Sequence, residues 1–179
     1  MSVAAPGTLD LRDYIRDIPD HPRPGIVFRD LTPLFLDPAA LEQAVGRLAA
    51  WASERAVDYV VAAEARGFVL GGALAARIGA GFVPARKPGK LPREALSVEY
   101  ELEYGLDALE VHSDALAGGA RVLVHDDLMA TGGTADALCR LVESAGAEVA
   151  GCAFLVELAY LGGRERLGDR DVHALVVYD

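Results

Sequence analysis

Two hydrophobic periods alternate along the chain. Four short apolar runs, too short for helices, predict buried strands at 57–63, 81–86, 121–125 and 148–157. Apolar residues at helical spacing predict three helices, at 38–55, in the Gly/Ala-rich stretch that ends at Ile78, and at 135–144. Strands that alternate with helices form parallel βαβ units. We therefore expect an α/β fold whose central, mainly parallel sheet is flanked by helices.

Two regions do not fit this alternation. Residues 9–18 predict a short polar helix, and the segment 19–35 holds four prolines, which forbid a regular helix and indicate a structured loop. Further along, 87–94 is rich in Gly, Pro and charges and is expected to be mobile and exposed. The stretch 96–105 alternates apolar and polar residues, as in a strand with one solvent-exposed face. We expect 1–36 and the 87–105 region to form a cap, or hood, over the sheet.

The composition suits a single domain over 1–179, because 179 residues with 52% hydrophobic and 25% charged residues can bury one substantial core. The net charge of −10 disfavours binding to nucleic acid or to an anionic membrane surface. The sequence shows neither the pattern of a signal peptide nor a run of about 20 apolar residues for a membrane span. The two cysteines, Cys139 and Cys152, form no disulfide framework, so we expect a cytoplasmic protein.

The segment 126–134, DDLMATGGT, carries the strongest chemical signal. It lies between a predicted strand and a predicted helix, which is where open α/β sheets bind ligands. Asp126 and Asp127 can accept hydrogen bonds from sugar hydroxyls or hold a hard cation. A phosphate at the helix start would be bound by backbone N–H groups and hydroxyls of Ala130, Thr131, Gly132, Gly133 and Thr134. An exposed strand end followed by an ordinary turn with a Thr cap is the alternative.

Taken as a whole, 122–134 (VLVHDDLMATGGT) resembles the 5-phosphoribosyl-1-diphosphate (PRPP) motif of the type I phosphoribosyltransferases. The resemblance implies the fold of that family, with a small hood and a flexible loop. It also implies that Asp126 and Asp127 contact the 2′- and 3′-hydroxyls of the ribose, and that 130–134 wraps the 5′-phosphate. His125 departs from the motif, which has an aliphatic residue there. A buried structural histidine is favoured over a catalytic one, because His125 precedes the loop.

Further blocks resemble the adenine phosphoribosyltransferase family in the same order, at 19–35, 64–71, 86–92, 98–105 and 155–158. This resemblance covers nearly the whole chain and implies a base pocket formed by the Pro-rich segment and Leu158. Val27 would line the pocket, Phe28 would stack on the purine face, and the backbone of Arg29 would read the base edge. Without the resemblance, core packing would be the simpler role for a lone Phe in a loop.

The resemblance also implies four cationic ligands for the diphosphate of PRPP. Arg66 lies in EARGF after a predicted strand, and a guanidinium suits multidentate oxyanion binding; a surface salt bridge is the alternative. Arg86, Lys87 and Lys90 stand within five residues, which is ordinarily a solvated turn. In the family this segment reaches the diphosphate, in part from a neighbouring subunit, so a homodimer is implied.

Glu103 and Tyr104 lie at the end of the segment 92–105, which would close as a lid to exclude water. By resemblance, Glu103 is the carboxylate that exchanges a proton with N7 of the base. Without the resemblance, Glu103 would be expected on the solvent-exposed face of a strand, together with Glu99 and Glu101. Mg²⁺, held mainly by PRPP and water rather than directly by the protein, would stabilise the departing diphosphate.

The resemblance therefore implies an enzyme of purine salvage that converts adenine and PRPP to AMP and diphosphate. A xanthine or other purine phosphoribosyltransferase is the nearest alternative, and the matches at 24–35 and Glu103 favour adenine. A PRPP-sensing regulator would need a DNA-binding module. Neither an extension before residue 19 nor a basic stripe supports one.

Overall fold

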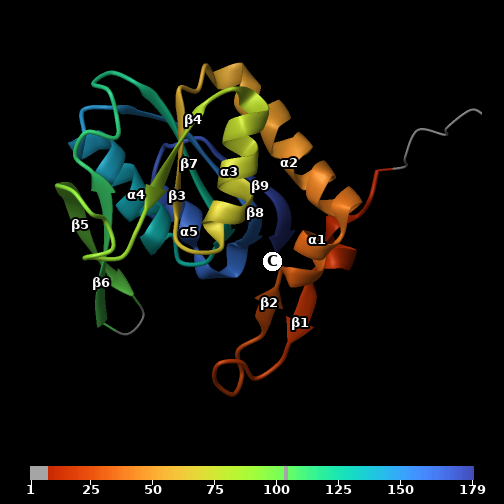
Figure 1. Cartoon of the computed structure of the whole chain (residues 1–179). Coiled ribbons are helices and arrows are strands. Elements are labelled where there is room, and N and C mark those ends of the chain that lie inside the picture. Colours follow the sequence, from red (N-terminus) through yellow and green to blue (C-terminus); the bar gives the residue numbers. More distant parts are fainter. Residues whose placement is uncertain (1–7, 103–104) are drawn as a thin grey trace, which may run out of the picture.

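A five-stranded parallel sheet forms the centre of the protein, which a computed structural model describes at residues 8–102 and 105–179 (Figure 1). Its strand order is β4-β3-β7-β8-β9 and all four strand pairs are parallel. The expected α/β fold with a mainly parallel central sheet is confirmed. The bounds of the strands are β3 (Tyr59–Ala63), β4 (Gly81–Ala85), β7 (Arg121–Met129), β8 (Glu148–Leu158) and β9 (Val172–Tyr178).

Helices α2 (Pro38–Ala52) and α3 (Gly67–Ile78) cover one face of this sheet, and α4 (Gly133–Ser144) covers the other (Figure 1). The start of α2 is fixed as the sequence predicts, because the Asp37 carboxylate accepts hydrogen bonds from the backbone N–H groups of Ala39 and Ala40, both at 2.9 Å. Gly79 ends α3 in the left-handed conformation, with φ +73°. Short turns at η2 (Ser53–Arg55), η3 (Ala159–Leu161) and α5 (Gly163–Leu167) complete these connections.

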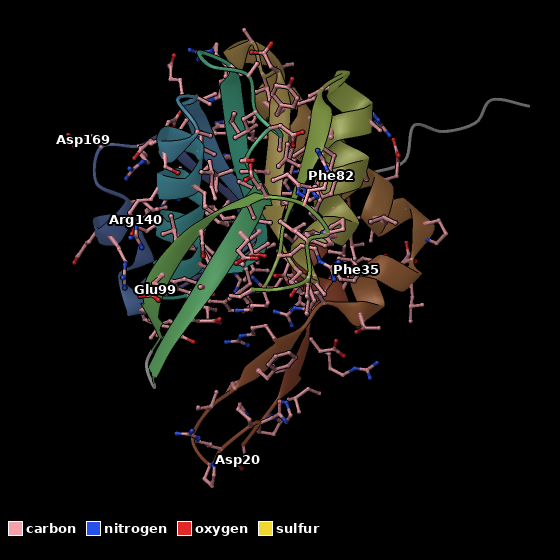
Figure 2. The ribbon with its side chains drawn as sticks, turned by 60° about the vertical axis from the view of Figure 1, so that its left-hand side comes forward. Asp20, Phe35, Phe82, Glu99, Arg140 and Asp169 are labelled. Atoms are coloured by element: carbon pink, nitrogen blue, oxygen red, sulfur yellow. The ribbon has the colours of Figure 1, made fainter. Side chains whose placement is uncertain are left out.

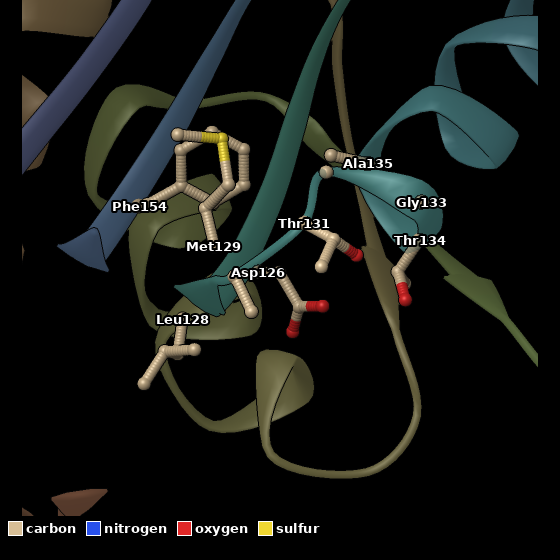
Figure 3. Close-up of a pocket in the computed structure, with 10 residues that line it drawn as sticks. Asp126, Leu128, Met129, Thr131, Gly133, Thr134, Ala135 and Phe154 are labelled. Atoms are coloured by element: carbon tan, nitrogen blue, oxygen red, sulfur yellow. The ribbon is translucent and has the colours of Figure 1, made fainter. Parts of the chain in front are cut away.

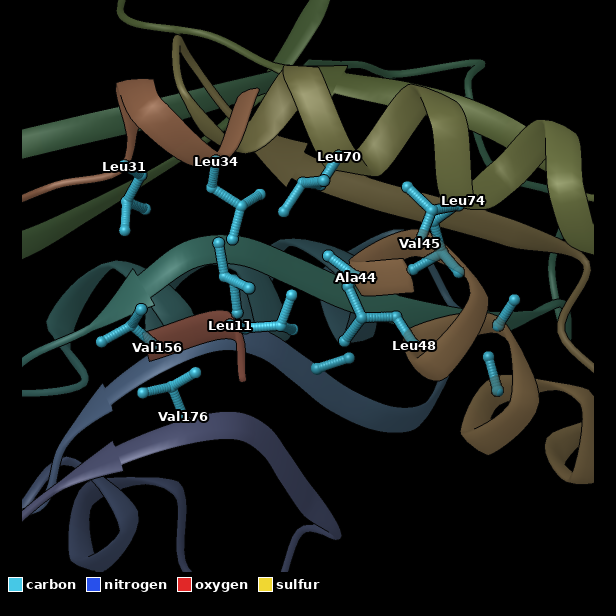
Figure 4. Close-up of a cluster of buried hydrophobic side chains, with 14 of the residues drawn as sticks. Leu11, Leu31, Leu34, Ala44, Val45, Leu48, Leu70, Leu74, Val156 and Val176 are labelled. Atoms are coloured by element: carbon cyan, nitrogen blue, oxygen red, sulfur yellow. The ribbon is translucent and has the colours of Figure 1, made fainter. Parts of the chain in front are cut away.

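The sheet separates two hydrophobic cores. The core under α2 and α3 is packed by Leu48, Leu70 and Leu74, all fully buried (Figure 4). The core on the α4 side contains Leu138 and Phe154, also fully buried. A strand covered on both faces by helices needs apolar side chains at successive positions, which explains the continuous apolar run in β7. In the part of the chain that the structure describes, no helix has the length and apolarity needed to cross a membrane.

The prediction of a helix over 9–18 is wrong. A 3-10 turn, η1 (Leu11–Tyr14), is followed directly by strand β1 (Arg16–Ile18), which pairs antiparallel with β2 (Phe28–Asp30). Pairing with a strand about ten residues further along the chain overrides the local helical pattern. The hairpin projects from the body of the molecule, with Asp20 at its tip (Figure 2), and α1 (Thr32–Leu36) leads back to α2.

The 87–105 region does not join this hairpin in a single cap. Strand β5 (Ala95–Leu102) pairs antiparallel with β6 (Gly105–His112), and this second hairpin lies against α4. The Arg140 guanidinium of α4 donates to the Glu99 carbonyl of β5 at 3.0 Å, and the two residues lie near each other in Figure 2. The expected strand over 96–105 is thus confirmed for its greater part, whereas β6 and β9 were not among the predicted strands.

Candidate active site

The acidic pair lies inside a strand, so the prediction that a loop begins at residue 126 is wrong. Strand β7 continues to Met129, because Asp126, Leu128 and Met129 pair with β8. Asp127 is buried with 4% exposure and Asp126 is half-buried. The two carboxylates therefore belong to the rigid sheet edge at the start of the phosphate loop, and the alternative of an exposed strand end is excluded for Asp127.

The loop 130–134 is shaped by close backbone packing. Gly132 has φ +79°, and a Cβ there would lie 2.6 Å from the Gly163 carbonyl oxygen. No side chain caps the start of α4, so the backbone N–H groups of this 12-residue helix remain available to an anion. In Figure 3 the oxygen atoms of Asp126, Thr131 and Thr134 point into the same hollow, which these residues line. This is the geometry of a phosphate cradle beside a carboxylate.

Arg66 links this cradle to strand β3. It immediately precedes α3, and its Nε lies 2.7 Å from Asp127 Oδ2. Gly67 lets the start of α3 lie close to the Asp126 carboxylate, because a Cβ on Gly67 would lie 2.7 Å from Asp126 Oδ1. Arg66, Asp126 and Asp127 line one cavity of about 280 Å³. The structure thus brings together residues that the sequence separates by 60 positions and predicts to bind one substrate.

The pKa values of both aspartates are raised. Burial raises the pKa of Asp126, and the neighbouring charge of Asp127 raises it further. Burial also raises the pKa of Asp127, while the charge of Arg66 opposes this effect. Two carboxylates held this close and this deep disfavour carrying two full negative charges, so a ligand that supplies hydrogen-bond donors or a cation would stabilise them.

Glu64, which the sequence analysis did not select, organises the predicted diphosphate ligands. Its side chain is 8% exposed and accepts hydrogen bonds from Arg86 Nε at 2.9 Å, Lys90 Nζ at 2.7 Å and the Lys87 backbone N–H at 3.0 Å. Burial alone would raise the pKa of Glu64, but these donors outweigh it and lower that pKa to about 2. Its position in EARGF, at the end of β3, was the available signal.

Only one cation of this cluster reaches the cavity wall. Lys87 lines the cavity together with Arg66 and Asp127, whereas Arg86 and Lys90 do not line it and bind the carboxylate of Glu64, which does. The Lys87 ammonium is held by the Asp107 carboxylate and by the Tyr100 hydroxyl, the latter at 3.1 Å. Tyr100 lies in the block 98–105 but was not selected from it, and no motif in the sequence indicated Asp107; both belong to the β5–β6 hairpin.

A second, larger cavity of about 690 Å³ lies under the first hairpin and holds the predicted base-binding residues Val27, Phe28, Arg29 and Leu158. Phe28 is half-buried and belongs to neither hydrophobic core, so the core-packing alternative does not describe it. The Arg66 guanidinium lies 5.2 Å from its ring centroid. The sequence analysis missed Tyr160, which is 56% exposed on the cavity wall. Arg66, Thr131 and Thr134 also line this cavity, so it adjoins the phosphate cradle.

His125, like Arg86 and Lys90, lines none of these cavities. Glu103 and Tyr104 lie outside the described residues. His125 is fully buried in β7, with Nδ1 2.8 Å from the Ala153 carbonyl oxygen, and burial lowers its pKa to about 4. A neutral, buried imidazole beside a carbonyl fits the structural histidine that the sequence favours.

The family model for the phosphoribosyl transferase domain matches residues 35–177. The chain therefore belongs to the phosphoribosyltransferase family, which agrees with a sheet edge that presents a phosphate cradle, paired carboxylates and cations. Individual relatives of the chain belong to a narrower family. An adenine phosphoribosyltransferase from Rubrobacter xylanophilus is 59% identical over 94% of this chain and 91% of its own length, and one from Thermotoga neapolitana is 54% identical over 95% and 100%.

Solved structures agree with these relatives. The adenine phosphoribosyltransferase from Thermoanaerobacter pseudethanolicus superposes with a TM-score of 0.91 at 50% identity and covers 94% of this chain and 98% of its own. The enzyme from Giardia lamblia, solved with 9-deazaadenine, has a TM-score of 0.90 at 36% identity and covers 95% and 97%. The resemblance to the adenine phosphoribosyltransferases and the type I fold are thereby confirmed.

Proposed function

We propose that the protein transfers the phosphoribosyl group of PRPP to adenine and releases AMP and diphosphate. One observation carries the proposal: the apolar cavity shares Thr131 and Thr134 with the phosphate cradle, and shares Arg66 with the cavity of the paired carboxylates. A base in the apolar cavity and a ribose phosphate in the cradle would therefore lie next to each other. The adenine phosphoribosyltransferases among the relatives match nearly the whole chain, which supports adenine as the base.

The positions of the residues proposed to bind PRPP support a role for each. Backbone N–H groups of 130–134 and the hydroxyls of Thr131 and Thr134 would bind the 5′-phosphate. Asp126 and Asp127 would accept hydrogen bonds from the ribose hydroxyls, which neutralises part of their mutual repulsion. These contacts fix the anomeric carbon near the base pocket, so that the nucleophilic nitrogen of the base and the leaving diphosphate lie on opposite sides of it.

Departure of diphosphate leaves positive charge on the ribose and places negative charge on the leaving group. Arg66 and Lys87 line the cavity where that negative charge would develop, and both are cationic. Phe28 and the exposed apolar side chains Ile26 and Val27 of the first hairpin would hold the base against Leu158. By resemblance, Glu103 exchanges a proton with N7 of the base as the new bond forms.

The charge of the cavity supports a role for Mg²⁺. Two cations, Arg66 and Lys87, face three carboxylates, Glu64, Asp126 and Asp127, so the wall has no excess positive charge for a polyanion such as PRPP. Among the described residues no cluster of three or more His, Cys, Asp or Glu could hold a metal ion alone. Mg²⁺ carried by PRPP would supply the missing positive charge and stabilise the departing diphosphate.

A homodimer and a cytoplasmic location belong to the same proposal. The homodimer is based on the family resemblance at 86–92, where a neighbouring subunit contributes to the diphosphate site. Light scattering after size exclusion would measure the mass against that of one 18.9 kDa chain.

The cytoplasmic location is based on the two free cysteines, whose sulfur atoms lie 3.7 Å apart without a disulfide.

One assay tests the activity. PRPP and Mg²⁺ are offered with adenine, hypoxanthine, guanine or xanthine in turn, and the loss of free base is followed with and without a chelator. We expect turnover of adenine, dependent on the divalent cation. Preferential turnover of xanthine or guanine would assign the protein to a different purine phosphoribosyltransferase, and PRPP binding without any turnover would favour a sensor.

A further inference from the structure

Two guanidinium groups from the amino-terminal part of the chain stack on the ring of Tyr178 at the end of β9. The Arg29 guanidinium carbon lies 3.9 Å from the ring centroid, and that of Arg12 lies 4.4 Å from it. Arg12 also donates to the Val177 carbonyl at 2.5 Å. Figure 1 shows the chain ending beside the base of the β1–β2 hairpin. Two segments at opposite ends of the sequence are thus joined at one aromatic ring.

The β1–β2 hairpin needs such an attachment because its strands pair only with each other in the described sheets. Arg29 of β2 is 13% exposed, and its guanidinium lies over the Tyr178 ring. Its ion pair with Asp17 lies within the hairpin, where the two residues are also paired in register, so it fixes no contact with the central sheet. Arg29 Nε is buried without a hydrogen-bond partner. The stack on Tyr178 is therefore a contact through which the hairpin is positioned on the sheet.

Tyr178 is also tied to the opposite wall of the base cavity. It pairs with Leu158 in the β8–β9 ladder, and Leu158 lines that cavity. The Tyr178 side chain itself does not line the cavity. One residue thus contacts Arg29 on the hairpin wall through its ring and Leu158 on the sheet wall through its backbone.

We propose that Tyr178 is a positioning residue of the base pocket, which holds the Val27–Phe28–Arg29 wall at a fixed distance from Leu158. The inference rests on the proposed function and extends it to a residue outside every motif singled out in the sequence. An unattached wall would have to be ordered each time a base binds, and that ordering lowers affinity for the base without altering the sites for phosphate and diphosphate. A pair of cation–π contacts is of the size that changes such an affinity by roughly 5- to 30-fold.

The test compares Tyr178→Leu, Tyr178→Phe and the parent by steady-state kinetics with each substrate varied in turn. For Tyr178→Leu we expect the KM for adenine to rise by about 5- to 30-fold, with the KM for PRPP and kcat nearly unchanged. Tyr178→Phe keeps the ring and should restore the KM for adenine to near the parent value.

Trp51→Leu is the matched control, because β9 carries a second aromatic stack far from the pocket. Trp51 stacks on His173 with centroids 5.1 Å apart, and the Arg55 guanidinium lies 3.4 Å from its ring centroid. Its removal should lower the melting temperature and leave the KM for adenine at the parent value. A purely structural role for Tyr178 would give this same result for Tyr178→Leu.

An unchanged KM for adenine in folded Tyr178→Leu, or an equal rise in the KM of both substrates, would overturn the proposal. Folding is checked by the melting temperature, and Tyr178→Phe provides a second variant if Tyr178→Leu does not fold; a large rise with Phe would then also overturn it. The parent is assayed first with all four purine bases. If it uses a base other than adenine, the proposed function fails while the Tyr178 comparison is made with that base.

Discussion

Arg66 Nε and Asp127 Oδ2 lie 2.7 Å apart and join the start of α3 to the end of β7. This ion pair connects the residue expected to bind diphosphate with a residue expected to bind ribose. Without substrate, each group serves as the counter-charge of the other. In the proposed binding mode, PRPP would exchange this contact for its own, and the positive charge of Arg66 would become available to diphosphate when Asp127 accepts hydrogen bonds from the ribose hydroxyls.

Asp127→Asn should weaken the use of PRPP without unfolding the protein. The pKa of Asp127 is raised by burial, so the charged form costs folding free energy and a neutral amide of the same shape is tolerated. Loss of hydrogen bonds from sugar hydroxyls to a charged acceptor should raise the KM for PRPP by roughly 10- to 100-fold. Steady-state kinetics and thermal unfolding measure the two effects.

Asp171→Asn is the control for this substitution, because Asp171 is 59% exposed and binds Arg55 away from both cavities. It should change neither the KM nor the melting temperature appreciably. A large loss of melting temperature in Asp127→Asn with PRPP affinity intact would assign Asp127 a structural role.

Glu64→Gln should lower stability in a pH-dependent way. The folded pKa of Glu64, about 2, lies below its ordinary value of 4.5, so its contribution is fully present above pH 4.5 and is lost as the pH falls towards 2. The shift corresponds to roughly 3 kcal/mol of unfolding free energy. Denaturant unfolding should therefore show a large difference between parent and variant at pH 7 that shrinks below pH 4.5.

The same variant should raise the KM for PRPP, because Arg86 and Lys90 lose the acceptor that holds their side chains in place and Lys87 loses a backbone anchor. Glu148→Gln, which removes a 63% exposed partner of Arg121, is the control. A pH-independent difference in stability would show that Glu64 acts through packing and not through its charge.

The sequence correctly predicts a strand, a Gly-rich turn and a helix start around 126–134, because an apolar run, two acids and adjacent glycines are all local features. It misplaced the end of β7, since the acids read as loop residues and only pairing with β8 keeps 126–129 in the strand. The contacts of Glu64, Asp107 and Tyr178 depend on residues that lie 20 or more positions away in the chain. Local hydrophobic periodicity does not indicate such contacts. Glu64 stands in EARGF beside a selected arginine, whereas Asp107 and Tyr178 stand outside every motif selected in the sequence.

Glu103→Gln tests the proton exchange that the resemblance assigns to this residue. An amide keeps the shape and hydrogen-bonding capacity of the carboxylate but cannot accept the proton, so kcat should fall while the KM for PRPP changes little. General acid–base groups contribute about 100- to 10,000-fold, and a loss in that range is expected. Glu99→Gln on strand β5 is the control. Turnover by Glu103→Gln at nearly the parent rate would mean that the purine proton goes to solvent or to another group.

Gly163→Ala should disturb the phosphate cradle from outside the motif that forms it. A Cβ on Gly163 would lie 2.5 Å from the Ala130 carbonyl oxygen and 3.2 Å from the Gly132 nitrogen, so the loop must shift away from α5. Overpacking of this kind costs about 1–3 kcal/mol, and a displaced loop no longer aims its N–H groups at the 5′-phosphate. Calorimetric titration with AMP should show at least about a 10-fold loss of affinity, since each 1.4 kcal/mol is tenfold.

Gly118→Ala is the control, because Gly118 is exposed and a Cβ there meets nothing within 4 Å. Equal AMP affinity in Gly163→Ala and the parent would mean that the phosphate is held by side chains, and that the contact between Gly163 and the loop serves packing alone.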